Sequence, residues 1–304
     1  MNRLVAVLLA LSSTWTVASG QTAVAVGRRP ATLPAAEPVT GPTICGTVLV
    51  HRAFPSQFLR HSRDIWVYCP PGYDERSSSG RRYPVLYLHD GNNCFDSRTA
   101  FLRREWNVDE TAERMIRQRE LPPFLIVGVS NTPDREWEYT WVPGLVDGKR
   151  MGGGGRLYAQ FLQEELKPFI DRTYRTLREP RHTTVLGSSL GGLVSLYLGR
   201  FCSDTFGRVG VVSPSLWWAD RVAIRMARHL PRSLVIWLDG GFKEGQPGDP
   251  PRVIQDIRDL KSVLIDRGYV EWKNLGYVED PDGEHNEVAW ARRLPAVLKF
   301  LLAD

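Results

Sequence analysis

Cysteine is scarce in this sequence, and the patterns typical of metal or phosphate sites are missing. The 304 residues include four cysteines, namely Cys45, Cys69, Cys94 and Cys202. Their spacing resembles no zinc site, and no glycine-rich loop followed by Lys-Ser or Lys-Thr is present. We therefore expect the protein to use no metal ion and no other cofactor.

Long apolar runs are also missing. The apolar run near the N-terminus, Leu4–Leu11, is too short to span a bilayer. Arg3 precedes this run, and the small residues Ala18–Gly20 follow it. This pattern indicates a signal peptide over residues 1–20, with an N-terminal anchor helix as the alternative. We expect residues 21–43 to be a flexible leader and the mature protein to be secreted or periplasmic, without stable membrane insertion.

Charge of one sign is not concentrated anywhere in the chain. The sequence holds 39 basic and 34 acidic residues and has a net charge of +5. The basic residues are scattered among nearly as many acidic ones, which favours a solvated surface. Because no nucleic-acid motif appears either, we expect no nucleic-acid partner.

The segment Gly187–Gly191 has the pattern G-x-S-x-G and lies between two apolar segments. The β-branched run before it indicates a buried strand, and the periodic apolar run over residues 193–199 indicates a helix. In this context the pattern is typical of the sharp strand-to-helix turn that exposes a serine hydroxyl above a sheet. We predict Ser189 as a nucleophile, with a structural glycine turn as the alternative.

Strand and helix patterns alternate along the rest of the chain. Strands are indicated at residues 47–54, 65–69, 83–89, 124–129, 208–212, 234–238 and 270–278, and helices near residues 108–115, 157–170 and 253–266 and from residue 287. Residues 130–155 look irregular. This alternation implies a mostly parallel sheet with helices on both faces, and a serine elbow in mid-chain fits the α/β-hydrolase fold. Since no repeat or inner linker interrupts it, we predict one domain over residues 44–304.

Six segments carry a more specific resemblance. They are Trp66-Val-Tyr-Cys-Pro-Pro-Gly-Tyr73, Leu86-Tyr-Leu-His-Asp-Gly91, Glu165-Leu-Lys-Pro-Phe-Ile-Asp171, Gly187-Ser-Ser-Leu-Gly-Gly192, Ser213-Pro-Ser-Leu-Trp-Trp218 and His285-Asn-Glu-Val-Ala-Trp290. From about residue 44 to the C-terminus the chain resembles the putative-esterase family, which includes siderophore, feruloyl and acetylxylan esterases and the mycolyltransferases. One departure is Phe201-Cys-Ser203, where members of that family usually carry a proline.

A serine hydroxyl needs a base that accepts its proton during attack. In the α/β-hydrolase fold the chain order is serine, then acid, then histidine. Of the six histidines, His285 is the one that follows both Ser189 and the predicted strand at residues 270–278, and it lies in a polar loop. We predict His285 as the general base, with a surface histidine as the alternative.

Two carboxylates follow the predicted strand at residues 234–238. Asp239 stands at the strand end and Glu244 five residues later, in the pattern Asp-x-Gly-x-x-Glu. In relatives with this pattern the residue at the Glu244 position orients the histidine, so the resemblance favours Glu244. Asp239, which we expect to accept backbone N–H groups, is the alternative acid. Some siderophore-esterase relatives work with a serine–histidine pair alone.

Two backbone N–H groups should form the oxyanion hole. One belongs to Leu190, the residue after the nucleophile. The resemblance nominates Asn92 for the other, although an ordinary turn is the alternative reading of this segment. Among the aromatic residues on loops, we predict that Trp137, Trp217 and Trp218 bind substrate, because such loops leave the carboxyl ends of strands. Packing against the core is the alternative for each.

The even number of cysteines in an exported chain fits disulfides. If the predicted strands 47–54 and 65–69 pair as a hairpin, Cys45 and Cys69 lie opposite each other. Cys94 and Cys202 are then the remaining pair. Four cysteines allow three pairings, so the other two connectivities stay open.

These observations predict an exported serine esterase that cleaves a siderophore, aromatic or carbohydrate ester through an acyl-enzyme. An acyltransferase of the mycolyltransferase kind would use the same residues and pass the acyl group to a sugar hydroxyl. A binding protein without activity on the same fold is the third hypothesis, and the presence of serine, histidine and acid argues against it. The expected partner is a small-molecule or carbohydrate ester.

Overall fold

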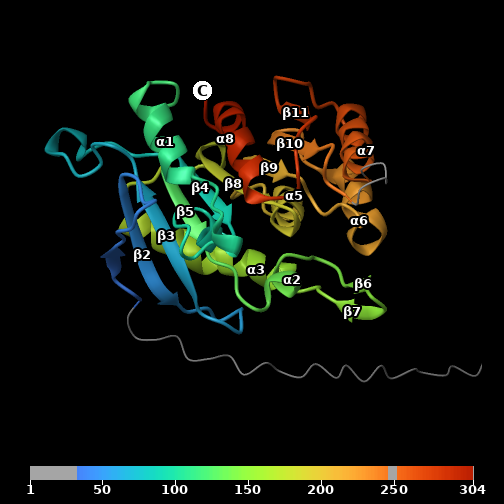
Figure 1. The fold of residues 1–304 in the computed structure, drawn as a ribbon, viewed down its shortest axis with the longest axis horizontal. Helices are drawn as coiled ribbons and strands as arrows, with labels where there is room; N and C mark the ends of the chain where they lie inside the picture. Colours follow the sequence, from blue (N-terminus) through green and yellow to red (C-terminus); the bar gives the residue numbers. More distant parts are fainter. Residues whose placement is uncertain (1–32, 246–251, 304) are drawn as a thin grey trace, which may run out of the picture.

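The computed structural model describes residues 33–245 and 252–303 (Figure 1). The predicted signal peptide at residues 1–20, and the leader up to residue 32, lie outside the described residues. Within the predicted leader, Ala36–Pro38 form strand β1, which pairs antiparallel with β2 (Thr47–Phe54). The sheet thus starts before residue 44, where we expected the domain to begin. An edge strand tolerates Pro38 because one of its sides needs no partner.

Nine strands of the described chain form one sheet in the order β1-β2-β3-β5-β4-β8-β9-β10-β11. The other strands are β3 (Arg63–Cys69), β4 (Val85–His89), β5 (Leu125–Val129), β8 (Thr183–Ser188), β9 (Arg208–Val212), β10 (Val235–Gly241) and β11 (Leu275–Asp280). The first three strands pair antiparallel, as does β3 with β5, and every pair from β5 to β11 is parallel. The predicted α/β-hydrolase fold is therefore confirmed.

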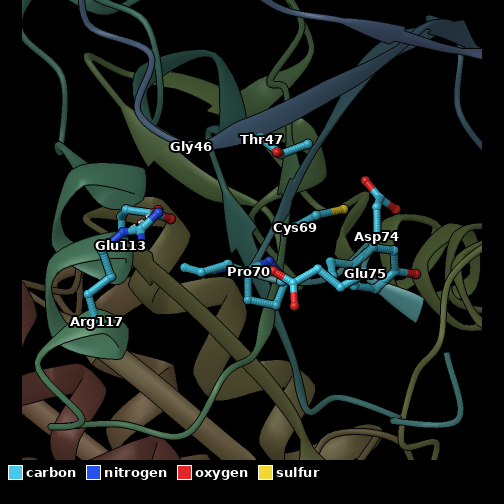
Figure 2. Close-up of a pocket in the computed structure, with 11 residues that line it drawn as sticks. Gly46, Thr47, Cys69, Pro70, Asp74, Glu75, Glu113 and Arg117 are labelled. Carbon is cyan, nitrogen blue, oxygen red and sulfur yellow. Dashed lines mark hydrogen bonds and ion pairs between the residues drawn. The ribbon is translucent and has the colours of Figure 1, made fainter. Parts of the chain in front are cut away.

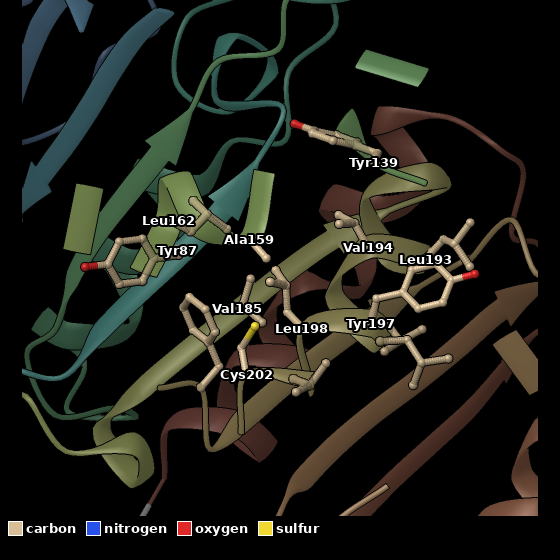
Figure 3. Close-up of a cluster of buried hydrophobic side chains, with 14 of the residues drawn as sticks. Tyr87, Tyr139, Ala159, Leu162, Val185, Leu193, Val194, Tyr197, Leu198 and Cys202 are labelled. Carbon is tan, nitrogen blue, oxygen red and sulfur yellow. The ribbon is translucent and has the colours of Figure 1, made fainter. Parts of the chain in front are cut away.

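Helices cover both faces of the sheet. The helices α1 (Val108–Arg117) and α8 (Glu287–Leu302) pack on one face. The other face is covered by α3 (Gly155–Gln160), a π-helical segment at Phe161–Leu166, α4 (Lys167–Thr173), α5 (Leu190–Phe201), α6 (Trp218–Met226) and α7 (Arg252–Asp266). Figure 3 shows the side chain of Leu198 of α5 lying next to Val185 of β8. This packing fixes the helix that follows Ser189. No helix among the described residues is long and apolar enough to cross a membrane.

The predictions for two segments were wrong. The segment expected to be irregular contains α2 (Arg135–Glu138) and a hairpin of β6 (Gly144–Val146) and β7 (Lys149–Met151). Its Asp147-Gly148 turn has φ values of 48° and 74°, the conformation that an Asp-Gly pair favours in a two-residue hairpin. The last strand occupies residues 275–280 rather than 270–278, because residues 270–275 form a turn held by Asn274.

The cysteine pairing predicted from the sequence was also wrong, because all four thiols are free. In the sheet Cys69 pairs with Thr47 rather than with Cys45, and the backbone N–H of Cys45 donates to Asp109 of α1. Figure 2 shows the Cys69 side chain directed away from α1. Cys94 and Cys202 are likewise separated by the sheet, since they belong to the core clusters of its two faces.

Candidate active site

Ser189 occupies a strained turn between β8 and α5. Its φ and ψ angles are 57° and −123°, outside the regions that L-residues favour, and its N–H donates to the carbonyl of Val212 at 3.1 Å. A Cβ on Gly187 would lie 2.7 Å from the carbonyl carbon of Gly191, so only glycine allows the strand and the helix to approach this closely. The turn thus has the geometry of the nucleophile elbow that the sequence predicted.

Ser189 and His285 line the same cavity, which has a volume of about 500 Å³. The hydroxyl of Ser189 lies 3.2 Å from the hydroxyl of Ser215, which follows β9. Asn92, Asn131 and Arg135 also line this cavity. The carboxyl ends of parallel strands therefore bring together the predicted nucleophile, the predicted base and a group of polar side chains.

The predicted acid and base contact each other. His285 Nδ1 lies 2.9 Å from Glu244 Oε2; the histidine side chain is 40% exposed and the glutamate side chain 1%. Their two loops are joined by backbone hydrogen bonds, including one from Lys243 N–H to the carbonyl of Gly283 at 2.8 Å. A Cβ on Gly241 would lie 2.2 Å from that carbonyl oxygen, so glycine is required where the loops meet.

The start of α8 fixes the position of His285. The side chain of Asn286 accepts a hydrogen bond from the N–H of Ala289 at 3.0 Å and so caps the helix. The His285 ring also meets the edge of Trp290 at a centroid distance of 5.1 Å. The cap fixes the backbone next to His285, and Trp290 and Glu244 restrict the imidazole ring.

A buried arginine neutralises the carboxylates around Glu244. Arg293 of α8 donates from Nη2 to Ser213 Oγ at 2.6 Å, and the same nitrogen lies 3.3 Å from Asp239 Oδ1 and 3.6 Å from Glu244 Oε1. Ser213 Oγ in turn donates to Glu244 Oε1, which also accepts the N–H of Gly241 at 2.7 Å. One oxygen of Glu244 is thereby fixed by these donors while the other contacts His285.

Asp239 has different partners. Its carboxylate accepts Trp237 Nε1–H at 2.7 Å and the N–H of Ser213 at 3.2 Å. Burial raises the pKa of Asp239 to about 6, although Arg293 and the bond from Trp237 act in the opposite direction. Glu244, and not Asp239, therefore contacts His285, while Asp239 holds the ends of β9 and β10 together.

A second arginine–carboxylate pair holds the turn that contains Asn92. Arg135 of α2 donates from Nε and Nη2 to the two oxygens of Asp90 at 2.7 and 2.8 Å, and Asn131 Nδ2 donates to the same carboxylate at 2.7 Å. Burial alone would raise the pKa of Asp90, but Arg135 and these hydrogen bonds hold it below its ordinary value. The N–H of Asp90 also donates to Tyr139 Oη at 3.1 Å.

The backbone of Asp90 has a left-handed conformation, with φ of 56° and ψ of 43°, and Asp90 precedes the short turn Gly91–Asn93. The N–H of Asn131 donates to Asn92 Oδ1 at 3.1 Å, so the turn is tied to the loop after β5 on a second side. Leu190 is the first residue of α5, where backbone N–H groups have no partner within the helix. Leu190 follows Ser189 directly in the chain, and Asn92 lines the same cavity as Ser189.

None of the three tryptophans predicted to bind substrate lines the cavity of Ser189. Trp218 is 2% exposed and donates from Nε1 to the carbonyl of Val142 at 2.8 Å, so it is a packing residue and its prediction as a substrate contact was wrong. Trp137 packs against Gly154 and under Arg60, and Trp217 lines a different cavity. The aromatic residues that line the cavity of Ser189 are Phe101, Trp106 and Trp290.

Sequence reasoning missed several residues that shape the site. Asn131 and Arg135 could have been found, because polar side chains that follow a buried strand at its carboxyl end point to the ligand side of the sheet. Arg293 and Ser213 gave no such signal, since their importance depends on contacts between α8, β9 and the loop of Glu244.

Another cavity, of about 400 Å³, lies near the ends of β2 and β3 (Figure 2). Its lining includes Cys69, Glu75, Glu113 and Arg117 and none of the predicted site residues. Glu113 is already bound by Tyr68 Oη–H and by Arg117. No group of three or more His, Cys, Asp or Glu side chains within the described residues is placed to hold a metal ion.

Comparisons with known proteins identify the family of this chain. The family described as Putative esterase matches residues 56–301. The chain is 27% identical over 262 residues to the uncharacterized protein YjcH of Bacillus subtilis, covering 84% of this chain and 98% of that protein. It is 28% identical over 161 residues to the ferri-bacillibactin esterase BesA of the same species, covering 48% and 53%.

Among solved structures, the siderophore hydrolase EstA from Aspergillus nidulans superposes with a TM-score of 0.66 at 20% identity, covering 90% of this chain and 100% of that one. This likeness concerns the fold. Because the family match spans most of the chain and includes the elbow, the histidine and the acid, this protein belongs to the Putative esterase family and is an ester hydrolase.

Proposed function

We propose that this protein is a serine esterase that works through an acyl-enzyme. The observation that carries the proposal is the shared cavity of Ser189, on its strained elbow, and His285, whose Nδ1 is bound by buried Glu244. A carboxylate at Nδ1 keeps the proton on that nitrogen and leaves Nε2 free to accept the serine proton.

In the first half-reaction Ser189 Oγ attacks the ester carbonyl carbon while His285 takes the hydroxyl proton. The N–H groups of Leu190 and Asn92 stabilise the oxyanion that forms. Collapse breaks the bond to the alcohol oxygen, which receives the proton from His285 and leaves. Water then adds to the acyl-enzyme with His285 as base, and the carboxylic acid is released with regeneration of Ser189.

The lining of the cavity supports an aromatic acyl group as the part of the substrate bound there. Phe101, Trp106 and Trp290 supply aromatic surface, and such rings bury large planar groups favourably. The names of BesA and EstA record siderophore esters as the substrates of those proteins. We therefore propose, as the substrate class, esters whose acyl part carries an aromatic group, whether in a siderophore or on a carbohydrate.

A fluorophosphonate probe followed by peptide mapping tests the nucleophile. We expect one adduct, on Ser189, in the wild-type protein and none in Ser189→Ala, while Ser195→Ala labels normally because that hydroxyl is buried against the carbonyl of Gly191. Hydrolysis of aromatic, siderophore and sugar esters, with product analysis in the presence of a sugar acceptor, then separates hydrolysis from acyl transfer. An unlabelled Ser189 would exclude the serine mechanism.

We also propose that the chain is exported, from the sequence of residues 1–20 alone. Sequencing the N-terminus of the protein recovered outside the cytoplasm tests this. A mature chain that still begins at Met1 would contradict it.

A further inference from the structure

A second cavity, of about 530 Å³, has a lining that comes from the β6–β7 hairpin and the start of α6 and shares no residue with the lining of the cavity of Ser189. Figure 1 shows the hairpin projecting past α2 and α3 toward α6. Its apolar lining includes Trp217, which is 49% exposed, and Leu145, which is 74% exposed. Arg150 and Asp220 add one charge of each sign. Large apolar side chains this exposed and grouped around a cavity indicate a ligand surface.

This surface is held firmly although it is exposed. The neighbouring Trp218 is buried beneath the hairpin, where a Cβ on Gly144 or on Gly152 would lie within 2.8 Å of its ring. Its indole N–H donates to Val142, as described above. Trp218 thus anchors the hairpin, and Trp217, whose ring centroid is 5.7 Å away, is left facing outward.

The backbone that follows Trp218 is strained. Ala219, Asp220 and Arg221 all have positive φ, between 48° and 57°, a conformation that is costly for residues with a Cβ. Arg221 compensates by pairing with Asp256 and Asp259 of α7. Strain that neighbouring contacts maintain in this way is typical of ligand-binding segments.

Ser215 lies between the reacting serine and Trp217 of the second cavity, because it contacts Ser189 and precedes Trp217 by two residues. The N–H of Ser215 donates to the carbonyl of Ser189 at 3.0 Å, and the two hydroxyls lie 3.2 Å apart. Trp217 is two residues further on, which limits its Cα to within about 8 Å of that of Ser215. An ester has an acyl side and an alcohol side, and the cavity with Phe101, Trp106 and Trp290 accounts for only one of them.

We propose that the surface formed by Leu145, Arg150, Trp217 and Asp220 binds the alcohol side of the ester, and that this alcohol is a sugar. The proposal rests on the serine esterase function proposed above. A sugar ring presents an apolar C–H face that fits the exposed indole of Trp217, and hydroxyl groups around its edge. Those hydroxyls can accept from Arg150 and donate to Asp220.

The test compares two substrates that share an acid, namely the methyl ester and the glucose ester of one hydroxycinnamic acid. We expect Trp217→Ala to lower kcat/KM for the glucose ester about 3- to 10-fold more than for the methyl ester, the size of a lost aromatic contact. Arg150→Ala should likewise lower kcat/KM more for the glucose ester than for the methyl ester. The matched control is Trp272→Ala, because Trp272 is 64% exposed but packs on Trp237 and Phe300 beside the start of β11 and lines neither cavity.

If the ratio of kcat/KM for the glucose ester to that for the methyl ester is unchanged in both Trp217→Ala and Arg150→Ala, the sugar site is overturned. A benzyl ester of the same acid gives a second criterion: if Trp217→Ala affects it more than the glucose ester, the surface takes an aromatic alcohol and the sugar assignment is wrong. Failure of the serine mechanism is distinguishable, because then the wild-type protein would hydrolyse neither ester through Ser189 and would not react with the fluorophosphonate.

Discussion

Two arginine–carboxylate clusters flank Ser189, and they differ in what the carboxylate touches. On the acid side, the carboxylate of Glu244 shares Arg293 with Asp239 and contacts His285 with its second oxygen. On the turn side, both oxygens of Asp90 are bound by Arg135. A carboxylate that keeps one oxygen for an imidazole can orient a base, whereas one that is fully occupied can only hold backbone in place.

The comparison shows that burial and charge pairing do not by themselves distinguish chemistry from structure. Glu244, Asp239 and Asp90 are all buried, and each lies near an arginine. Only the contact with His285 separates Glu244 from the other two carboxylates. The following variants test this division of roles.

Removing the hydroxyl of Ser189, which lies between the two clusters, should lower kcat the most. Ser189→Ala should lower kcat by about 10⁴–10⁶, as the loss of the nucleophile does in serine proteases, with little change in Tm. Measuring kcat and Tm on a p-nitrophenyl ester checks this, with Ser195→Ala as the control serine in the same helix. Substantial activity left in Ser189→Ala would show that Ser189 is not the nucleophile.

Glu244→Gln should have the second largest effect and should lower kcat by a factor of up to about 10⁴. The amide oxygen can still accept from Gly241 and Ser213, so the fold should persist. The amide N–H₂ would then face His285 Nδ1 and force the proton onto Nε2, which could no longer act as the base. The measurement is kcat against KM, and we expect KM to change little.

Asp239→Asn is the matched control for that variant. Its amide N–H₂ would face one of the two donors, Trp237 Nε1–H or the N–H of Ser213, so Tm should fall while kcat is largely kept. The cost of one unsatisfied buried donor is about 1–3 kcal/mol. The reverse pattern, lost kcat in Asp239→Asn and lost Tm in Glu244→Gln, would exchange the two roles.

On the turn side, Arg135→Met should lower kcat by about 10²–10³, the usual cost of losing one oxyanion donor. Without the guanidinium the carboxylate of Asp90 is left unpaired beside Asn92, and the turn loses its fixed position. Arg135→Lys should restore part of the rate, since it returns the charge without the two-point contact. A rise in KM with unchanged kcat would instead make Arg135 a substrate-binding group.

Substitution of His89 should have the smallest effect on the rate at neutral pH. His89 directly precedes Asp90 and the turn Gly91–Asn93, and its ring contacts Tyr158 Oη at 2.9 Å. Burial lowers the pKa of His89 to about 3, although Asp90 acts in the opposite direction. Because the folded pKa lies below the unfolded value of about 6.5, its contribution to stability is complete above pH 6.5 and is lost as the pH falls toward 3.

The loss should be roughly 1.4 kcal/mol per pH unit in that window. Tm measured from pH 4 to pH 8 should therefore fall less steeply in His89→Gln than in the wild-type protein. Parallel Tm profiles would show that His89 takes no part in acid unfolding.

Local pattern was enough to predict much of this protein. The order of strands and helices and the elbow at Ser189 follow from short segments whose neighbours in sequence set their conformation. The order of residues along the chain indicated His285, and Glu244 was favoured by the resemblance to the family. The Asp147-Gly148 hairpin carried an equally local signal that the sequence analysis passed over.

The tertiary structure decided everything that depends on register and on contacts between distant segments. Strand pairing placed Thr47 opposite Cys69, and the two faces of the sheet separated Cys94 from Cys202, so the predicted disulfides do not form. Arg293 reaches Glu244 from α8, and Arg135 reaches Asp90 from α2. No local pattern encodes these contacts, because each depends on where packing places the backbones of two separate elements.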